Sequence, residues 1–370
     1  MNHHDNIREA LRVAGKGLVE REALCELIAL AAVAREHLLI IGPPGTAKSE
    51  AVRRMSKALG AKSFEYLLGR FTEPNEIFGP VDLAKLREGI VETRTEGMLP
   101  EAELAFLDEV FLGSTAILNT LLGMLNERVY RRGHTNIKTP LRVCVGASNH
   151  VPEDEALAAF GDRFVLRLYV EPIGDPMLED LLIGGWGLTE VPVVAGVEDL
   201  DALAAQVKAA DPTGIRPHLS HAVRKLRKAG IVLSDRRVVK CQKLACAAAV
   251  LDGRANPGPE DLWPIVYAVP TPDGQKLARD VLRDLLASCQ NKALASAAAE
   301  ASLGPAARAA RILEQGWTLL ETKPETPDEG WLLKVEGIAR EIDAGFSTDE
   351  LPEELATLRA RVVELLGPSK

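Results

Sequence analysis

A glycine- and proline-rich loop between an apolar run and a helical pattern constrains the fold of this chain most strongly. Residues 38–41 read Leu-Leu-Ile-Ile, and the next eight, Gly42 to Ser49, read Gly-Pro-Pro-Gly-Thr-Ala-Lys-Ser. This run differs from the phosphate-loop pattern G-x-x-x-x-G-K-[ST] at one position, where Ala47 replaces the second glycine. A buried strand, this loop and a helix from Lys48 predict a phosphate-binding site. A chance Gly/Pro turn is the less favoured alternative.

The loop residues have distinct expected roles. Gly42 and Gly45 allow backbone N–H groups to turn toward phosphate oxygens. Lys48 is expected to reach the β- and γ-phosphates, and the Ser49 hydroxyl to ligate Mg²⁺. The sequence therefore predicts binding of ATP and Mg²⁺ by this segment. Its expected binding residues are Gly42, Pro43, Pro44, Gly45, Thr46, Ala47, Lys48, Ser49 and Glu50.

A second apolar run ends in two carboxylates. Residues 104–109 read Leu-Ala-Phe-Leu-Asp-Glu. Asp108, at the carboxyl end of a sheet strand, is placed to hold Mg²⁺ through water, and Glu109 to polarise a water in line with the γ-phosphate. An Asp-Glu pair that merely starts a surface turn is the alternative, and the preceding phosphate loop disfavours it.

Three further polar residues are candidates for contact with the γ-phosphate. Asn149 follows an apolar run and is expected to lie beside the strand that ends in Asp108 and Glu109, where its amide would hold the attacking water or the γ-phosphate. Arg163 is expected to donate to the nucleotide of a neighbouring subunit, and Arg236 to reach back to the bound nucleotide from a helix capped by Ser234. Each has an ordinary alternative: a strand end for Asn149, a local ion pair for Asp162 and Arg163, and a solvated helix residue for Arg236.

The hydrophobic pattern predicts the fold class. Apolar runs at 38–41, 104–107, 141–147 and 164–170 alternate with helical patterns such as 116–126. This alternation favours an α/β domain with a parallel sheet flanked by helices. After Pro172 only helices are expected. Their approximate ranges are 178–183, 200–210, 219–228, 236–251 and 275–287, with further helices in the last eighty residues.

Composition excludes several other classes. The chain of 370 residues is 46% hydrophobic and 26% charged, which is ordinary globular usage. The start of the chain shows no signal peptide and no apolar run is long enough to span a bilayer, so we expect a cytoplasmic protein without membrane insertion. The five cysteines form no CxxC pair, which makes a zinc or disulfide framework improbable. A net charge of −9 disfavours nucleic-acid binding, although residues 216–254 are basic.

Taken together, these motifs resemble the MoxR family of AAA+ ATPases, and most closely its RavA-like branch. The similarity covers about residues 7 to 290. Besides the loop and the acidic pair, it rests on segments 16–21, 70–80, 117–122, 126–128, 147–149, 162–163 and 234–237.

The resemblance implies roles for individual residues. Lys48 and Ser49 correspond to Walker A, Asp108 and Glu109 to Walker B. Asn149 corresponds to sensor 1, Arg163 to the arginine finger and Arg236 to sensor 2. The segment Gly17, Leu18 and Val19 is implied to border the adenine.

The resemblance also implies an organisation and a function. We expect an AAA+ core at 1–172, a helical lid at 173–290 and a helical C-terminal accessory domain at 291–370, where the similarity stops. Such proteins are typically ring hexamers that remodel a protein substrate together with a von Willebrand A-domain partner. The alternatives are a nucleotide-gated scaffold with slow hydrolysis and, less favoured, a DNA-translocating ring.

Two inserts are expected to form hairpins, one within 80–100 and one within 129–140. In the family such hairpins face the ring pore. For Arg131 and Arg132 in the second insert, a solvated turn is an equally weighted alternative.

Overall fold

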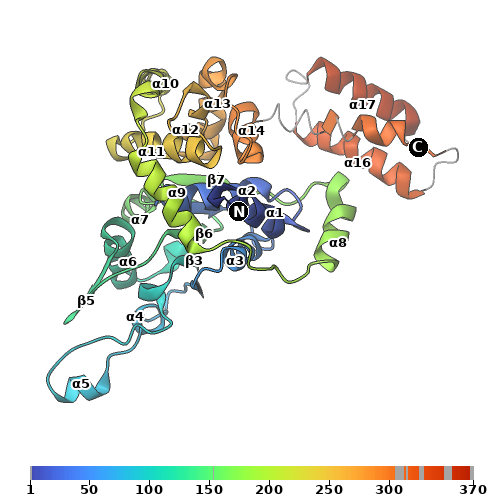
Figure 1. Ribbon diagram of the computed structural model, residues 1–370. Coiled ribbons are helices and arrows are strands. Elements are labelled where there is room, and N and C mark those ends of the chain that lie inside the picture. The colour runs from blue at the N-terminus through green and yellow to red at the C-terminus, as the bar shows by residue number, and fades with distance from the viewer. Residues whose placement is uncertain are drawn as a thin grey trace.

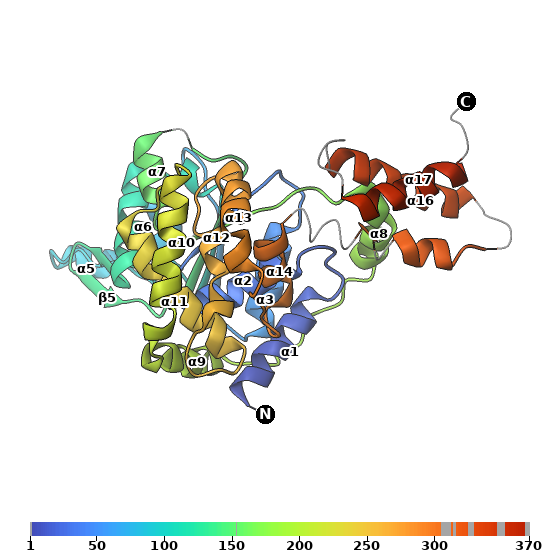
Figure 2. The same cartoon turned by 90° about the horizontal axis from the view of Figure 1, so that it is seen from above.

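The computed structural model describes residues 2–152, 154–304, 312–313, 316–324, 329–345 and 352–366. A central sheet with helices on both faces lies beside a group of further helices, and a separate helical unit lies at one side (Figures 1 and 2). The α/β architecture with a helical lid predicted from the sequence is confirmed.

Within the described residues the central sheet has five strands, all parallel, in the order β2-β3-β6-β1-β7. The strands that have continuous apolar runs are those the sequence predicts. The fifth, β2, was not predicted, because it lies at the edge of the sheet and its residues alternate between exposed and half-buried. The bounds are β1 Leu38–Ile41, β2 Ser63–Leu67, β3 Leu104–Asp108, β6 Val143–Ser148 and β7 Leu166–Tyr169.

The two faces of the sheet pack against different helices. Alternate residues of β1 show this, since Leu38 and Ile40 belong to one core cluster and Leu39 and Ile41 to another. The first face is covered by α1 (His3–Gly15), α2 (Glu22–Val33) and α3 (Lys48–Ala58). The second is covered by α6 (Thr115–Glu127) and α7 (Glu155–Gly161), with η2 (Val110–Leu112). Burial on both faces explains why the strands read as unbroken apolar runs.

The lid helices share the first core cluster with α1 and α2. They are α9 (Val197–Ala209), α10 (Arg216–Lys228), α11 (Asp235–Leu251), α12 (Pro264–Tyr267) and α13 (Pro272–Leu286). Two short 3₁₀ helices, η4 (Pro212–Gly214) and η5 (Pro259–Asp261), lie between them. The next helix, α14 (Ala295–Leu303), also belongs to this core, and the Glu26 carboxylate on α2 accepts hydrogen bonds from the α14 amides of Ser296 and Ala297. We therefore propose that the C-terminal domain begins after Leu303 rather than at 291.

The C-terminal unit has a core of its own. It contains α16 (Glu329–Gly345) and α17 (Glu353–Leu366), and it lies beside η3 (Asp175–Met177) and α8 (Leu178–Trp186) (Figure 1). The two contacting elements belong to the linker between sheet and lid. The core residues of the C-terminal unit include Ile312, Trp331, Val335, Ile338, Ile342, Leu355, Leu358 and Val362.

The two inserts differ from each other. The prediction for 129–140 is confirmed, because β4 (Val129–Arg132) and β5 (Thr135–Lys138) form an antiparallel pair. The prediction of a hairpin within 80–100 is wrong: a short helix, α5 (Leu83–Arg87), is capped by Asp82, and one isolated bridge joins Val81 to Thr93. The surrounding elements are α4 (Pro74–Phe78) and η1 (Leu99–Glu101).

The state of the cysteines and the length of the helices relate to two expectations from the sequence. All five cysteines lie in the described part of the chain, buried and without disulfides, and burial raises the pKa of Cys25, Cys144 and Cys241 to about 12. None of the helices in the described ranges has the length and apolar character needed to cross a bilayer.

Candidate functional site

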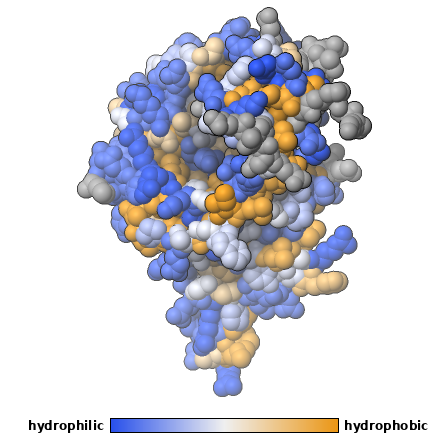
Figure 3. Space-filling view, turned by 90° about the vertical axis from the view of Figure 1, so that its right-hand side faces the viewer, coloured by the Kyte–Doolittle hydropathy of each residue, from blue (hydrophilic) through white to orange (hydrophobic). Residues whose placement is uncertain are grey.

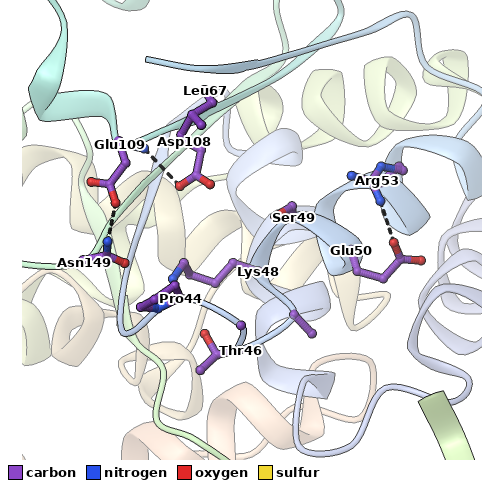
Figure 4. A pocket seen from close by; sticks show the side chains of 12 residues that line it. Pro44, Thr46, Lys48, Ser49, Glu50, Arg53, Leu67, Asp108, Glu109 and Asn149 are labelled. Atoms are coloured by element: carbon purple, nitrogen blue, oxygen red, sulfur yellow. Dashed lines mark hydrogen bonds and ion pairs between the residues drawn. The ribbon is translucent and has the colours of Figure 1, made fainter. Parts of the chain in front are cut away.

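A cavity of about 500 Å³ lies at the carboxyl ends of β1, β3 and β6 (Figure 4). This is the edge at which ligands bind in open parallel sheets. Most of the predicted loop residues, the acidic pair and Asn149 meet here. The residues that line it are Pro44, Gly45, Thr46, Ala47, Lys48, Ser49, Glu50, Arg53, Leu67, Asp108, Glu109 and Asn149.

The conformation of the loop depends on its glycines. A Cβ atom at Gly42 would lie 2.2 Å from the Val170 carbonyl oxygen, so only glycine fits where the loop leaves β1. Gly45 has a φ of +80°, a left-handed conformation that glycine adopts without steric cost. The loop therefore reverses direction and leads into the N-terminus of α3.

Ala47 has a left-handed backbone conformation, which glycine adopts without steric cost. Its φ is 58° and its ψ is 24°, in the left-handed region, and it is the residue immediately before α3. For a residue with a Cβ this costs about 1 kcal/mol. The alanine at this position therefore adds a small local strain to the loop.

Lys48 folds back onto the loop. Its Nζ atom donates to the carbonyl oxygens of Gly42 at 2.6 Å and Pro43 at 2.8 Å, and the side chain is buried. Burial lowers the pKa of Lys48, and the nearby carboxylates of Asp108 and Glu109 oppose that shift. The ammonium group is thus held at the mouth of the loop, where phosphate oxygens could replace the carbonyl acceptors.

The acidic pair and Asn149 form a polar group opposite Lys48 (Figure 4). The Asn149 amide donates a hydrogen bond to the Glu109 carboxylate, across the neighbouring strands β3 and β6. Asp108 accepts a hydrogen bond from the Glu109 backbone N–H at 3.0 Å. Glu109 has a φ of 48°, and strained backbone of this kind recurs at functional sites.

The residues present fit a magnesium ion. Ser49 and Asp108 both line the cavity and offer the oxygen ligands that Mg²⁺ prefers. Among the described residues there is no cluster of three His, Cys, Asp or Glu side chains that could enclose a metal. Two oxygen ligands from the protein suit Mg²⁺, which keeps several waters and is completed by substrate phosphates.

Other predicted site residues lie outside the cavity lining. Gly17, with a φ of +81°, packs against the backbone of Gly184 in α8, while Leu18 is buried and Val19 half-buried. Gly42 and Pro43 contact Lys48 but are not lining residues.

Arg163 and Arg236 are also outside the lining. The Arg163 Nε atom is buried and has no hydrogen-bond partner among the described residues, and Arg236 is exposed. The next arginine, Arg237, is buried instead, and its Nε donates to the Asp162 carboxylate at 2.6 Å. Asp162 thus pairs with the lid rather than with its neighbour Arg163.

Sequence reasoning missed Arg53 and Leu67 as cavity residues. Arg53 lies one helical turn after Ser49, on the same face of α3, and pairs with Glu50 at 2.7 Å and Glu65 at 2.9 Å. The spacing of four residues between Ser49 and Arg53 could have indicated that Arg53 lies on the side of α3 that faces the cavity. Leu67 pairs with Asp108 in the sheet register, and it was missed because β2 itself was missed.

The fold and this site define a nucleotide-binding ATPase of the P-loop class. A family model described as the MoxR domain in MoxR-vWA-beta-propeller ternary systems matches residues 5–206, and an AAA lid domain model matches residues 213–276. The chain belongs to the MoxR family of AAA+ ATPases. The RavA-like branch stays a prediction.

Individual proteins are also similar to this chain. An uncharacterized protein of Methanocaldococcus jannaschii is 36% identical over 259 residues, 70% of this chain and 69% of its own length. A second uncharacterized protein of that organism is 35% identical over 263 residues, 71% of this chain and 68% of its own length. A crystal structure of a candidate ATPase from Cytophaga hutchinsonii has a TM-score of 0.63 at 16% identity, covers 78% of this chain and 96% of the other, and supports the fold alone.

Proposed function

We propose that this chain hydrolyses ATP to ADP and phosphate and uses the energy to remodel a protein partner. The observation that carries the proposal is the convergence of Lys48, Asp108, Glu109 and Asn149 on one cavity at the sheet edge. These are the residue types that phosphoryl transfer to water requires: a cation for the phosphates, an acidic residue for the metal and a polar group to orient water.

Each group has a definite task in this proposal. Lys48 exchanges its two loop carbonyls for phosphate oxygens, which strengthens a charge-assisted interaction. Ser49 and Asp108 hold Mg²⁺, which neutralises charge on the phosphates when it is bound. Glu109 accepts a proton from the attacking water, and Asn149 orients the Glu109 carboxylate.

Measurement of phosphate release tests the hydrolytic function. We expect Lys48→Ala to lower ATP turnover at least about 10²-fold, because the phosphates lose their positive partner. Lys57→Ala is a matched control, since Lys57 is an exposed lysine on the same helix, outside the cavity lining. Equal turnover in the wild-type protein and Lys48→Ala would contradict this role of Lys48. Partner binding that depends on ATP but not on Glu109 would favour the nucleotide-gated scaffold with slow hydrolysis.

We further propose that the active form is a ring, with a hexamer as the expected size. Arg163 follows Asp162 in the sequence and Arg236 precedes Arg237, so each arginine is next to one member of the Asp162–Arg237 ion pair. Neither arginine lines the cavity of its own subunit. This arrangement is consistent with a role for both in the site of a neighbouring subunit. Apolar side chains on α8 also support assembly, because Leu182 and Ile183 are each 71% exposed and Trp186 is 95% exposed.

Mixed oligomers test the proposed action between subunits. Arg163→Ala subunits retain Glu109, and Glu109→Gln subunits retain Arg163, so one intact site forms at each correctly ordered interface. We expect the turnover of mixtures to depart from the sum of the separate variants. Strict additivity at every mixing ratio would contradict action in trans.

A von Willebrand A-domain protein is the proposed partner. The name of the matching family model supports it, because that model describes MoxR domains in systems with vWA and β-propeller proteins. The Glu109→Gln protein loaded with ATP is the suitable bait, since it is expected to remain in the ATP-bound state. Binding of a purified vWA-domain protein to this bait, and its loss with Lys48→Ala, is the expected result.

A further inference from the structure

Arg21 joins the phosphate loop to the start of the linker between sheet and lid. It immediately precedes α2 and is 5% exposed. Its Nε donates to the Thr46 carbonyl in the loop at 2.9 Å, and its Nη2 donates to the Glu171 carbonyl at 2.9 Å, just after β7. One guanidinium therefore spans the loop and the first residue of the linker.

Arg54 makes the corresponding connection to the end of the linker. It lies on α3, the helix that follows the loop, and it is also 5% exposed. Its guanidinium donates to carbonyls at the end of α1, Ala14 at 2.8 Å and Lys16 at 2.8 Å, and to the Thr189 carbonyl at 3.1 Å. The linker 171–189 is thus bound at both ends by side chains fixed to the nucleotide-binding elements.

The middle of the linker contacts the same region. A Cβ atom on Gly184 of α8 would lie 2.6 Å from the Gly17 carbonyl oxygen, so the two backbones are in close contact. The C-terminal unit lies on the other side of this linker, with Lys334 paired to Glu179 at 2.6 Å and Arg340 to Asp175 at 3.4 Å. Figure 3 shows this side of the molecule, with apolar side chains gathered on its surface.

The geometry of the contacts requires arginine. Each side chain serves carbonyls on two or three separate segments, which a planar guanidinium with five donors can do and a lysine ammonium cannot reproduce. Loss of such a side chain removes a donor from a buried carbonyl oxygen, that of Thr46 for Arg21 and that of Ala14 for Arg54. Arg21 also lies close enough to Lys48 to lower the pKa of that lysine, after the larger effect of burial, so it adds positive potential at the phosphate loop.

We propose that Arg21 and Arg54 are positioning residues that couple nucleotide binding at the phosphate loop to the position of the linker 171–189. Phosphate binding reduces the mobility of Thr46 and α3. The two guanidinium groups transmit this loss of mobility to Glu171 and Thr189 through their hydrogen bonds. The C-terminal unit contacts the same linker, so its position follows the nucleotide state. The inference rests on the proposed nucleotide site but not on hydrolysis or on ring assembly.

The experiment combines nucleotide binding with hydrogen exchange of the full chain. Binding of a fluorescent ADP is measured for the wild type, Arg21→Gln, Arg21→Lys, Arg54→Gln and Arg54→Lys. Hydrogen exchange of residues 171–189 is compared with and without ADP. Arg128→Gln is the matched control, because Arg128 is a partly buried arginine that donates to the carbonyls of Arg35 and Leu125, away from the cavity lining and the linker.

The expected result separates coupling from general destabilisation. ADP protects the linker in the wild type and in Arg128→Gln, whereas both Gln variants lose this protection and bind ADP about tenfold more weakly. The Lys variants lie between, and they keep the test decisive if a Gln variant fails to fold. Unchanged ADP affinity and unchanged linker protection in the Arg21 and Arg54 variants would overturn the inference. Absence of ADP binding by the wild type would instead overturn the proposed function.

Discussion

The Asn149 amide donates a hydrogen bond to the Glu109 carboxylate, which joins the ends of the neighbouring strands β6 and β3. Glu109 has a left-handed backbone conformation, so its side chain leaves the strand in a direction that an extended residue would not allow. The hydrogen bond fixes the carboxylate near Lys48 and Asp108, in the cavity that we propose binds ATP.

Removal of this amide is expected to affect catalysis more than binding. Asn149→Ala leaves the Glu109 carboxylate free to rotate, so we expect kcat to fall roughly 10²-fold with KM for ATP within about threefold of wild type. Steady-state phosphate release gives both constants. A large rise in KM at unchanged kcat would show that Asn149 binds the nucleotide rather than positions Glu109.

The left-handed conformation of Ala47 predicts a stabilising substitution. Ala47→Gly removes the Cβ strain but adds freedom to the unfolded chain, so we expect the free energy of unfolding to rise by about 0.5 kcal/mol. Ala51→Gly, at a buried position in the middle of α3, is the control and is expected to destabilise by at least about 1 kcal/mol. Thermal unfolding of both variants measures the difference. A lower melting temperature for Ala47→Gly would contradict the strain at this position.

Glu26 predicts a pH dependence of stability. Burial raises its pKa from 4.5 to about 7, although the backbone N–H groups of Ala297 and Ser296 oppose this. Because the folded pKa is higher than the unfolded one, the stabilising contribution is fully present below about pH 4.5 and is lost as pH rises through 7. Glu26→Gln removes this titration, so its melting temperature should rise relative to wild type between pH 5 and 8. A constant difference across that range would refute the raised pKa.

The adjacent arginines of α11 are expected to behave oppositely. Arg237 is buried, pairs with Asp162 and donates to the carbonyls of Phe164, Val165 and Ala268, so Arg237→Ala should destabilise by about 3–5 kcal/mol. Arg236 is exposed, and Arg236→Ala should leave the melting temperature unchanged while ATP turnover falls. Loss of turnover only in Arg237→Ala, in proportion to its loss of folded protein, would remove Arg236 from the proposed site.

Much of the fold was predictable because four strands of the described sheet are buried on both faces and read as unbroken apolar runs. The meeting of Asn149 with Glu109 followed from the same pattern, since residues after neighbouring parallel strands share one sheet edge. β2 escaped prediction because its edge position leaves alternate residues exposed. The segment 80–100 was misread because its pairing stops at the bridge between Val81 and Thr93, and α5 follows instead of a longer strand. Its alternating residues also contact the β4–β5 hairpin, where Thr93 donates to Thr135 and His134 donates to Val91.

The other features that the sequence did not indicate depend on tertiary packing. Nothing in the pair Arg236-Arg237 tells which arginine is buried, because that depends on how α11 packs against the segment after Asp162. Arg21 and Arg54 likewise read as ordinary charged residues, and only the fold shows that their acceptors are carbonyls up to 150 positions away.

ATP turnover and ATP binding by Glu109→Gln, measured on the same sample, test the central claim most directly. Glutamine keeps the size and the hydrogen-bonding capacity of the side chain but cannot accept a proton from water. We predict that phosphate release falls at least about 10²-fold while the affinity for a fluorescent ATP stays within about threefold of wild type. Turnover at the wild-type rate in Glu109→Gln would contradict the account.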